Sequence, residues 1–270
     1  MLQKLLKYDF KFIFRYWVIG ALISLVMSLA GGGCIILLSS DKDLPTPVDT
    51  AAILIIVMVV ISFIAFLILS LILTFIRFYK NFFSDEGYLT FTLPVKTSTL
   101  LASKTIVGVA ATVSTTLVMV LDLFLMLWIG IGNDVPREIG ELFADAYRAI
   151  GPVLTLYIIE GLLVFLAGVV FTVLFTYACI TFASIITKKA RVITAIGIYY
   201  GANSVITFLK QMFFIFGVQS LGTWLGPLSE DSIKLSVALL LFALIAFVTM
   251  FCGLMYLLDR YMLDRKLNLA

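Results

Sequence analysis

The chain of 270 residues contains no histidine, few prolines and little charge. Without histidine it lacks the usual ligands of zinc hydrolases, the axial ligand of His-bound haem and the base of a Ser-His-Asp triad, so these classes are excluded. No G-x-x-x-x-G-K-[ST] segment occurs, so the chain has no P-loop of its own for ATP. Hydrophobic residues make up 62% of the sequence, against roughly 45–50% in soluble globular domains. This composition indicates a membrane protein.

Cysteine is also scarce, and its placement argues against a metal or redox site. Cys34, Cys179 and Cys252 each lie inside an apolar run, and no CxxC pair is present. They are best interpreted as small buried hydrophobic side chains. We therefore predict no metal ligand and no catalytic residue in this chain. The net charge of +3 does not indicate nucleic-acid binding, because the cations fall where anionic lipid headgroups attract them.

Six apolar runs dominate the sequence. Each is long enough to cross the ~30 Å hydrocarbon core of a bilayer at ~1.5 Å per helical residue. We therefore predict an all-α integral membrane protein with six transmembrane helices and a single transmembrane domain over residues 1–270. The predicted spans are 17–38, 51–76, 105–131, 152–186, 190–217 and 233–258.

The basic residues between the runs predict the orientation. With the N-terminus inside, the inner segments hold fourteen Lys and Arg, whereas the outer loops hold four. Basic residues near the ends of spans resist translocation. Both termini are therefore expected on the cytoplasmic side of the cell membrane. The outer segments 39–50, 132–151 and 218–234 are read as short acidic loops, and the last of them, with Trp224 and Pro227, is predicted to re-enter the membrane before the final span.

Residues 1–16 have the pattern of an amphipathic helix. Four basic residues share a narrow arc at 100° per residue, and apolar side chains fall largely opposite. We predict a helix in the membrane interface, with a simple basic flank that orients the first span as the alternative. The basic residues are Lys4, Lys7, Lys11 and Arg15.

Three ionisable residues lie well inside predicted spans, namely Asp122, Glu160 and Lys210. All three fall roughly 10–13 Å from the outer ends of their helices. They form either an interhelical ion cluster or a polar wall of a translocation pathway, since intramembrane charges usually face the bundle interior or a cavity. Asn203 and Gln211 add polar edges to the fifth span. The glycines at 161, 168, 197 and 201 are expected to mark close helix crossings.

The inner segment Arg77–Lys104 is longer than a tight connection needs. Asp85-Glu86-Gly87 breaks the second helix, and Pro94 ends the stretch that follows. Thr97 or Ser98 is a suitable N-cap for the next helix. Such a loop presents a docking surface to a soluble partner, or it is an ordinary linker that lies on the bilayer.

This loop resembles the cytoplasmic signature of type-2 ATP-binding cassette (ABC) transporter permeases, the bacterial permease subunits with the type V exporter fold. The matching residues are Phe83–Val95, which contain E-G-x-L-x-x-x-L-P-V, followed by Leu100–Lys104 at the start of a helix. The resemblance implies six spans, both termini inside, an interfacial N-terminal helix, a re-entrant outer segment, and a coupling helix between spans two and three. The residues that it implies for docking on the ATPase are Asp85, Glu86, Gly87, Tyr88, Leu89, Leu93 and Pro94.

The resemblance also implies a function. The chain is expected to be the permease of an ATP-driven exporter, paired with a second permease of the same or a homologous sequence. Two ATPase subunits would bind ATP and Mg²⁺, so this chain itself is not expected to be an enzyme or to hold a cofactor. The apolar bundle favours a hydrophobic or amphipathic cargo, such as cationic peptides. A secondary transporter that uses Asp122, Glu160 and Lys210, and a non-transporting membrane scaffold or sensor, are the alternatives.

Overall fold

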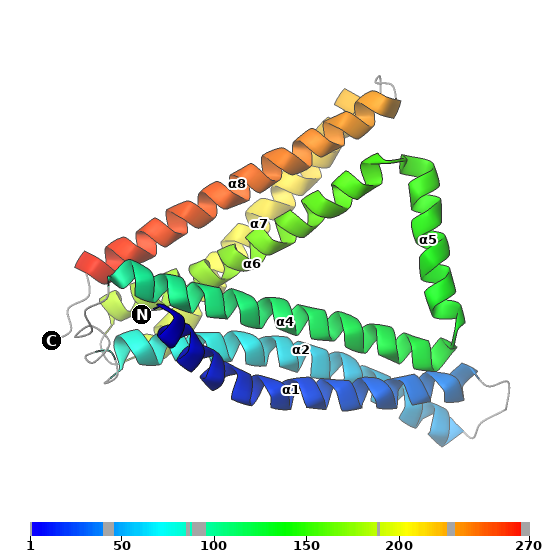
Figure 1. The fold of residues 1–270 in the computed structure, drawn as a ribbon, viewed down its shortest axis with the longest axis horizontal. Coiled ribbons are helices and arrows are strands. Elements are labelled where there is room, and N and C mark those ends of the chain that lie inside the picture. The colour runs from blue at the N-terminus through cyan, green and yellow to red at the C-terminus, as the bar shows by residue number, and fades with distance from the viewer. Residues whose placement is uncertain are drawn as a thin grey trace. The chain divides into compact units, whose positions relative to one another are not determined.

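The computed structural model describes residues 2–39, 46–84, 87, 96–187, 190–225 and 230–265, and within these ranges it contains helices and no strand (Figure 1). Each of the six predicted spans coincides with one helix. The helices are α1 (Leu2–Ser39), α2 (Thr46–Phe83), α4 (Thr97–Ile131), α5 (Asp134–Ile150), α6 (Val153–Ile186), α7 (Arg191–Leu225) and α8 (Glu230–Arg265).

Local sequence explains where several helices begin and end. Pro47 stands in the first turn of α2 and Pro152 at the N-cap of α6, positions where a missing N–H costs little. Asp134 opens α5, where a carboxylate is stabilised by the positive end of the helix dipole. Gly132 and Gly151 follow α4 and α5 with φ of 90° and 77°, the left-handed conformation that ends many helices.

The chain forms two compact units. The first comprises Met1–Phe78 with Ala102–Ala149, and the second comprises Tyr79–Leu101 with Ile150–Ala270. The first unit contains α1, most of α2 and α4, and α5. The second contains α6, α7, α8 and the two helix ends that flank the segment between α2 and α4.

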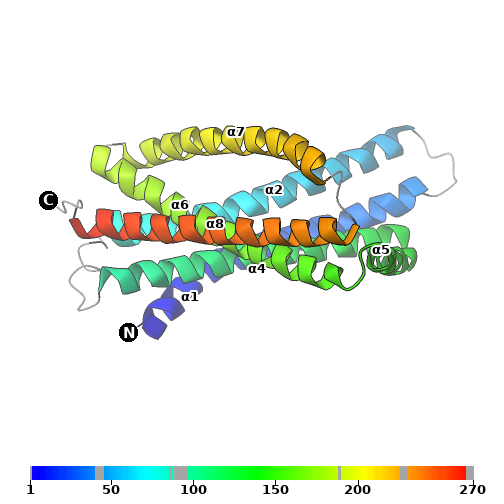
Figure 2. The same cartoon turned by 90° about the horizontal axis from the view of Figure 1, so that it is seen from above.

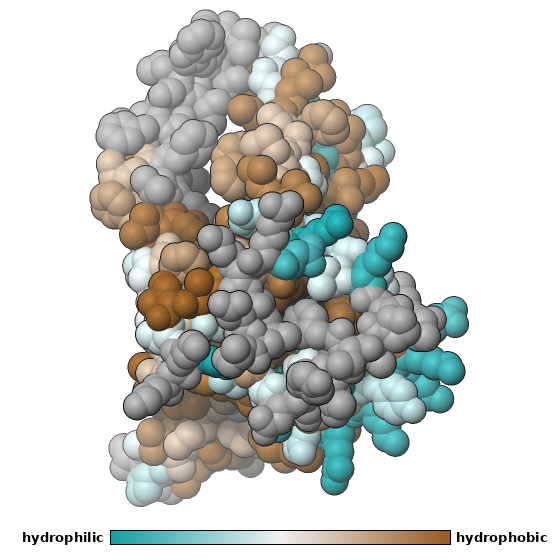
Figure 3. All heavy atoms as spheres, turned by 90° about the vertical axis from the view of Figure 1, so that its left-hand side faces the viewer, coloured by the Kyte–Doolittle hydropathy of each residue, from teal (hydrophilic) through white to brown (hydrophobic). Residues whose placement is uncertain are grey.

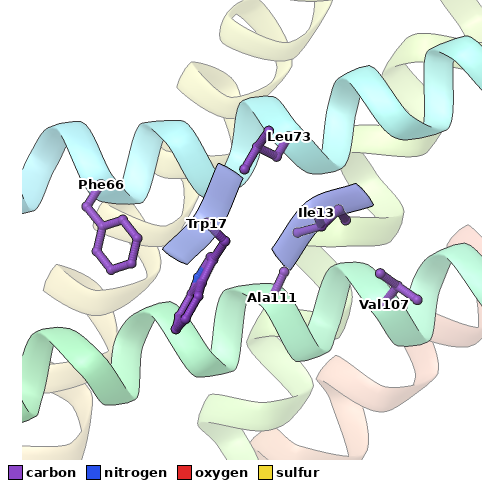
Figure 4. Packing of buried hydrophobic residues seen from close by; sticks show 6 residues of the cluster. All are labelled: Ile13, Trp17, Phe66, Leu73, Val107 and Ala111. Atoms are coloured by element: carbon purple, nitrogen blue, oxygen red, sulfur yellow. The ribbon is translucent and has the colours of Figure 1, made fainter. Parts of the chain in front are cut away.

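In the first unit, α1 and α4 run in the same direction, because their contacts advance together along both helices. Trp17 Nε1 donates to Thr115 Oγ1 at 2.8 Å, and Ser24 Oγ donates to Asp122 Oδ2 at 2.7 Å. The helix α2 runs antiparallel to α1, as three consecutive spans require. The apolar cluster where the three helices meet is shown in Figure 4 and consists of Ile13, Trp17, Phe66, Leu73, Val107 and Ala111.

Glycines let the helices of the first unit approach closely. A Cβ on Gly32 would stand 2.9 Å from the Met126 carbonyl oxygen, and one on Gly130 would stand 2.6 Å from the Ile35 Cβ. Lipid tails are as apolar as leucine, so membrane helices are held by close packing and hydrogen bonds. These glycines supply the close packing.

In the second unit, α6 packs against both α7 and α8. The Tyr157 hydroxyl donates to the Lys234 carbonyl at 2.7 Å near the start of α6, and the Cys252 thiol lies 3.5 Å from the Ala167 carbonyl further along. These two contacts show that α6 and α8 run parallel. On α7, the ring of Tyr199 lies 5.7 Å from that of Phe175 of α6.

Five of the helices are long and apolar enough to cross a membrane: α1, α2, α4, α6 and α8. The chain is therefore a multi-pass, all-helical membrane protein. The sixth predicted span lies within α7, which is helical but has several side chains outside the described part of the chain. Six spans and the orientation of the termini remain predictions.

Two predictions need correction. Residues 1–16 are not a separate element, because α1 continues without a break from Leu2 to Ser39 and curves along its length (Figures 1 and 2). The segment 132–151, predicted as an outer loop, contains the 17-residue helix α5. The re-entrant segment predicted for 218–234 stays a prediction: it covers the end of α7 and the start of α8, and residues 226–229 lie outside the described residues.

The predicted glycine crossings are also wrong. A Cβ added to Gly161, Gly168, Gly197 or Gly201 would meet no atom within 4 Å among the described residues. These glycines lie on open faces of α6 and α7, whereas the close crossings are made by glycines of α1 and α4.

Candidate functional site

The candidate site is the segment between α2 and α4, together with the side chains that hold its two ends. Of the predicted docking residues, the structure describes Gly87; Asp85, Glu86, Tyr88, Leu89, Leu93 and Pro94 lie outside the described residues. The helix ends on either side, up to Ser84 and from Lys96, are described. The described geometry is therefore that of the two helix ends on either side of the segment.

In the first unit, a buried ion triad joins α1 to both of the flanking helices. Asp9 of α1 accepts from Arg77 Nε of α2 at 2.7 Å and from Lys104 Nζ of α4 at 2.5 Å. The side chains of Asp9 and Lys104 are 1% and 4% exposed. The Arg77 guanidinium also lies 5.0 Å from the ring centroid of Phe12. Because buried charges are costly unless paired, this triad fixes α1 firmly against α2 and α4.

In the second unit, three contacts hold the ends of the segment itself. Arg191, at the start of α7, donates from Nη1 to the Phe83 carbonyl at 3.0 Å, which satisfies one of the free carbonyls at the end of α2. The Tyr256 hydroxyl of α8 donates to the Ser98 carbonyl at 3.0 Å. The Thr97 hydroxyl, in the first turn of α4, donates to Asp264 in the last turns of α8.

Gly87 is required sterically at its position. Its N–H donates to the Ser84 carbonyl at 2.7 Å, and a Cβ there would stand 2.7 Å from the carbonyl oxygen of Phe82. Because that atom belongs to the backbone, the clash cannot be relieved by a rotamer change. A side chain at the glycine of the E-G-x-L motif would therefore require the backbone at the end of α2 to shift.

The intramembrane polar residues have different surroundings. Asp122 is 2% exposed and accepts the hydrogen bond from Ser24 within the first unit. Glu160 of the second unit is 9% exposed, and its Oε2 has no hydrogen-bond partner among the described residues. The side chain of Lys210 lies outside the described part of the chain. The predicted cluster of these three residues therefore stays a prediction.

The remaining predicted residues are exposed. Asn203 and Gln211 lie on exposed positions of α7. Lys4, Lys7, Lys11 and Arg15 are exposed along the first turns of α1, as the amphipathic pattern predicts. On the face drawn in Figure 3, hydrophilic side chains lie mostly toward one edge, beside hydrophobic ones.

A signal for Asp9 was present in the sequence, and the prediction missed it. Asp9 lies opposite the four basic residues, in the middle of the apolar arc of α1, and an acid at such a position requires a partner. A second missed group is Asp259 of α8, which is fully buried with neither carboxylate oxygen hydrogen-bonded to a described residue. The partners of Asp9 come from helices about 70 and 95 positions away, so no local pattern identifies them.

Comparison with known proteins adds no relative: no protein-family model, no curated protein and no solved structure matches the chain.

Proposed function

We propose that the chain is the membrane-spanning permease of an ATP-driven ABC exporter, which works as a dimer of permeases with two ATPase subunits. The observation that carries the proposal is the fixation of both flanks of the segment between α2 and α4. Arg77 and Lys104 share Asp9, and Phe83 and Ser98 accept hydrogen bonds from α7 and α8. A push on this segment would therefore reach three other helices, α1, α7 and α8, through direct contacts.

The arrangement suits energy transfer from a partner. A chain without a P-loop needs an ATPase in trans, and a rigidly held connection transmits a displacement where a slack loop would absorb it. Rigid-body movement of packed helices about such a point is a common route for switching between access states. Gly87, one of the proposed docking residues, has no room for a side chain beside the Phe82 carbonyl oxygen at the end of α2.

Affinity purification from native membranes tests the proposal. The tagged full-length chain is expected to copurify with a P-loop ATPase. The variants Glu86→Ala and Tyr88→Ala are expected to lose most of that ATPase and of ATP-dependent transport in vesicles. Glu138→Ala, an exposed change on α5, is the matched control and should keep both. Unchanged ATPase recovery and transport in the two loop variants would refute the coupling role.

The cargo we propose is hydrophobic or amphipathic, with cationic peptides as the first candidates. Support comes from the apolar helix surfaces and from the acidic segments at the opposite ends of the spans, including four acids and two arginines on α5. Cells that carry the complete transporter are expected to survive higher concentrations of cationic amphipathic peptides than cells that lack it. Equal susceptibility would remove this cargo class and leave the transport proposal standing.

Ion-coupled secondary transport is the second candidate, favoured by two buried carboxylates of the second unit. Glu160 Oε2 and both oxygens of Asp259 have no hydrogen-bond partner among the described residues, and buried acids of this kind serve as proton relays in some transporters. The purified chain in liposomes, without any ATPase, separates the candidates. Cargo movement driven by a pH gradient, and abolished by Glu160→Gln, would favour this one.

A further inference from the structure

The helix α5, which connects the third and fourth predicted spans, has two chemically opposite faces. At 100° per residue its six charged side chains fall within an arc of roughly 100°, and the larger apolar side chains fill the opposite arc. The charged residues are Asp134, Arg137, Glu138, Glu141, Asp145 and Arg148; the apolar ones are Val135, Ile139, Leu142, Phe143, Tyr147 and Ile150.

The described residues leave most of the apolar face uncovered. Leu142 is 68% exposed, Phe143 54% and Ile139 41%, whereas Val135, next to the α4 junction, is 4% exposed. The charged face is well satisfied in water, because Arg137 pairs with Glu141 and Arg148 with Asp145 at exposed positions. An apolar stripe of this size needs a cover, and the helix cannot find one in aqueous solution.

The connections of α5 determine which cover is within reach. Two residues separate it from α4, and Gly151 and Pro152 separate it from α6, so both ends of α5 are held at the ends of apolar spans. Gly132 and Gly151 turn the chain at these joints with positive φ. In consequence α5 runs across the direction of α4, and it is seen end-on in Figure 2 where α4 lies along the page.

The end of α4 also carries the side chain that is typical of a membrane boundary. Trp128 is 43% exposed, and its Nε1 donates to Asn133 Oδ1 at 3.3 Å. Tryptophan is enriched at the level of the lipid headgroups, where its ring lies in apolar surroundings and its N–H is satisfied. Trp128 lies in the last turn of α4, six residues before α5 begins, and therefore marks the depth at which that helix starts.

From these observations we propose that α5 is an interfacial helix, with Ile139, Leu142 and Phe143 inserted among phospholipid acyl chains and the charged arc facing water. The occupant of its apolar face is the lipid monolayer. Four acids against two arginines give the helix a net negative charge, so its insertion needs no anionic lipid. The proposal stands whether or not the chain is an exporter, since it concerns the resting position of α5 in the membrane.

Quenching of a fluorescent label in the full-length chain tests the proposal. In a background with Cys34, Cys179 and Cys252 replaced by alanine, Leu142→Cys and Glu138→Cys are labelled separately with an environment-sensitive dye in phosphatidylcholine vesicles. A lipid spin-labelled high on its acyl chain should quench the dye at 142 several-fold more than the dye at 138, and aqueous iodide should do the reverse. The second pair, Phe143→Cys and Asp145→Cys, covers the case in which one variant fails to fold.

Two results would overturn the proposal. Iodide quenching at all four positions would place the whole helix in water, and shielding of positions 142 and 143 from both quenchers would mean that protein, such as a second copy of the chain, covers the apolar face. Repeating the measurement with one third phosphatidylglycerol should leave the pattern unchanged. Insertion only when anionic lipid is present would contradict the predicted charge independence.

Discussion

The helices within each of the two units are held to one another by different kinds of contact. In the first, buried polar side chains meet one another across helices: Asp9 with Arg77 and Lys104, Trp17 with Thr115, and Ser24 with Asp122. In the second, most of the described contacts between helices run from side chains to backbone carbonyls or between aromatic rings, and the Thr97–Asp264 hydrogen bond joins two side chains. The buried carboxylates of Glu160 and Asp259 have oxygens without a hydrogen-bond partner among the described residues.

This difference shows in which unit the register between neighbouring helices is specified by buried polar pairs. A polar pair buried between two helices specifies their register, because a shift leaves charges or hydrogen-bonding groups unsatisfied in a place that water cannot reach. Packing of apolar side chains tolerates small shifts at lower cost. The register of the first unit is therefore specified by buried polar pairs, whereas the second unit contains buried carboxylates without a hydrogen-bond partner among the described residues.

The largest effect is expected from removing Asp9, the acid that two basic residues share in the first unit. Asp9→Asn removes the buried acid that Arg77 and Lys104 share, and removal of one member of a buried ion pair costs about 3–5 kcal/mol. We expect a large drop in the SDS concentration at which the full-length chain unfolds in mixed micelles, followed by tryptophan fluorescence. Asp145→Asn, at a pair that is 72% exposed on the acid side, is the control and should change little.

Replacing Asp9 together with Lys104 tests the explanation. If the loss arises from an uncompensated charge, Asp9→Asn combined with Lys104→Met should recover part of the stability. A double variant that is less stable than Asp9→Asn alone would show that the triad contributes through packing rather than charge.

Glycine-to-alanine substitutions in the two units are expected to change the stability of the chain in opposite directions. Gly32→Ala in the first unit drives a Cβ to within 2.9 Å of the Met126 carbonyl oxygen, and overpacking of this kind costs about 1–3 kcal/mol. Gly168→Ala in the second unit meets nothing within 4 Å, and helix propensity favours alanine by roughly 0.5–1 kcal/mol. The same unfolding titration should therefore move in opposite directions. A loss at both positions would mean that another chain packs against α6 at Gly168.

The glycines also show how far the sequence carries the structure. Each apolar run predicts its helix correctly, because length and hydropathy are local properties. Whether a glycine lies at a crossing depends on the helix that packs against it, so Gly32 and Gly168 look alike in sequence and differ in the structure. Because the sequence does not show which helix packs against a glycine, the prediction placed the close crossings in α6 and α7 instead of α1 and α4.

For the candidate site, local signals predicted the break in the second helix, and the structure adds the steric requirement at Gly87. The pattern of α5 was present in the sequence as well, but its high content of charged residues at an outer position was interpreted as a loop. The partners of Asp9 and Phe83 come from distant helices. No periodicity within one segment reveals such pairs, and only the packed bundle does.

Replacing a buried acid of the second unit by an apolar residue tests whether that acid contributes to the stability of the unit. Asp259→Leu removes a carboxylate that is fully buried with no described partner. We expect stability to stay the same or to rise by about 1 kcal/mol, since an unsatisfied buried polar group carries a desolvation penalty of that order. The matched change Asp122→Leu, which takes the acceptor from Ser24, should destabilise the first unit. Marked destabilisation by Asp259→Leu would reveal a partner for it and weaken the contrast between the units.

The smallest effect is expected at the Arg137–Glu141 ion pair of α5, whose geometry is nearly that of the buried Arg77–Asp9 pair. Arg137 Nε lies 2.9 Å from Glu141 on α5, and Arg77 Nε lies 2.7 Å from Asp9, yet the arginines are 75% and 19% exposed. Arg137→Gln is expected to cost only about 0.2–0.5 kcal/mol, because water already solvates both partners. Unfolding titrations at low and high salt check this, and the small effect should vanish at high salt. A cost as large as that of Asp9→Asn would mean that burial is not what separates the two pairs, and the proposed position of the charged face of α5 in water would be wrong with it.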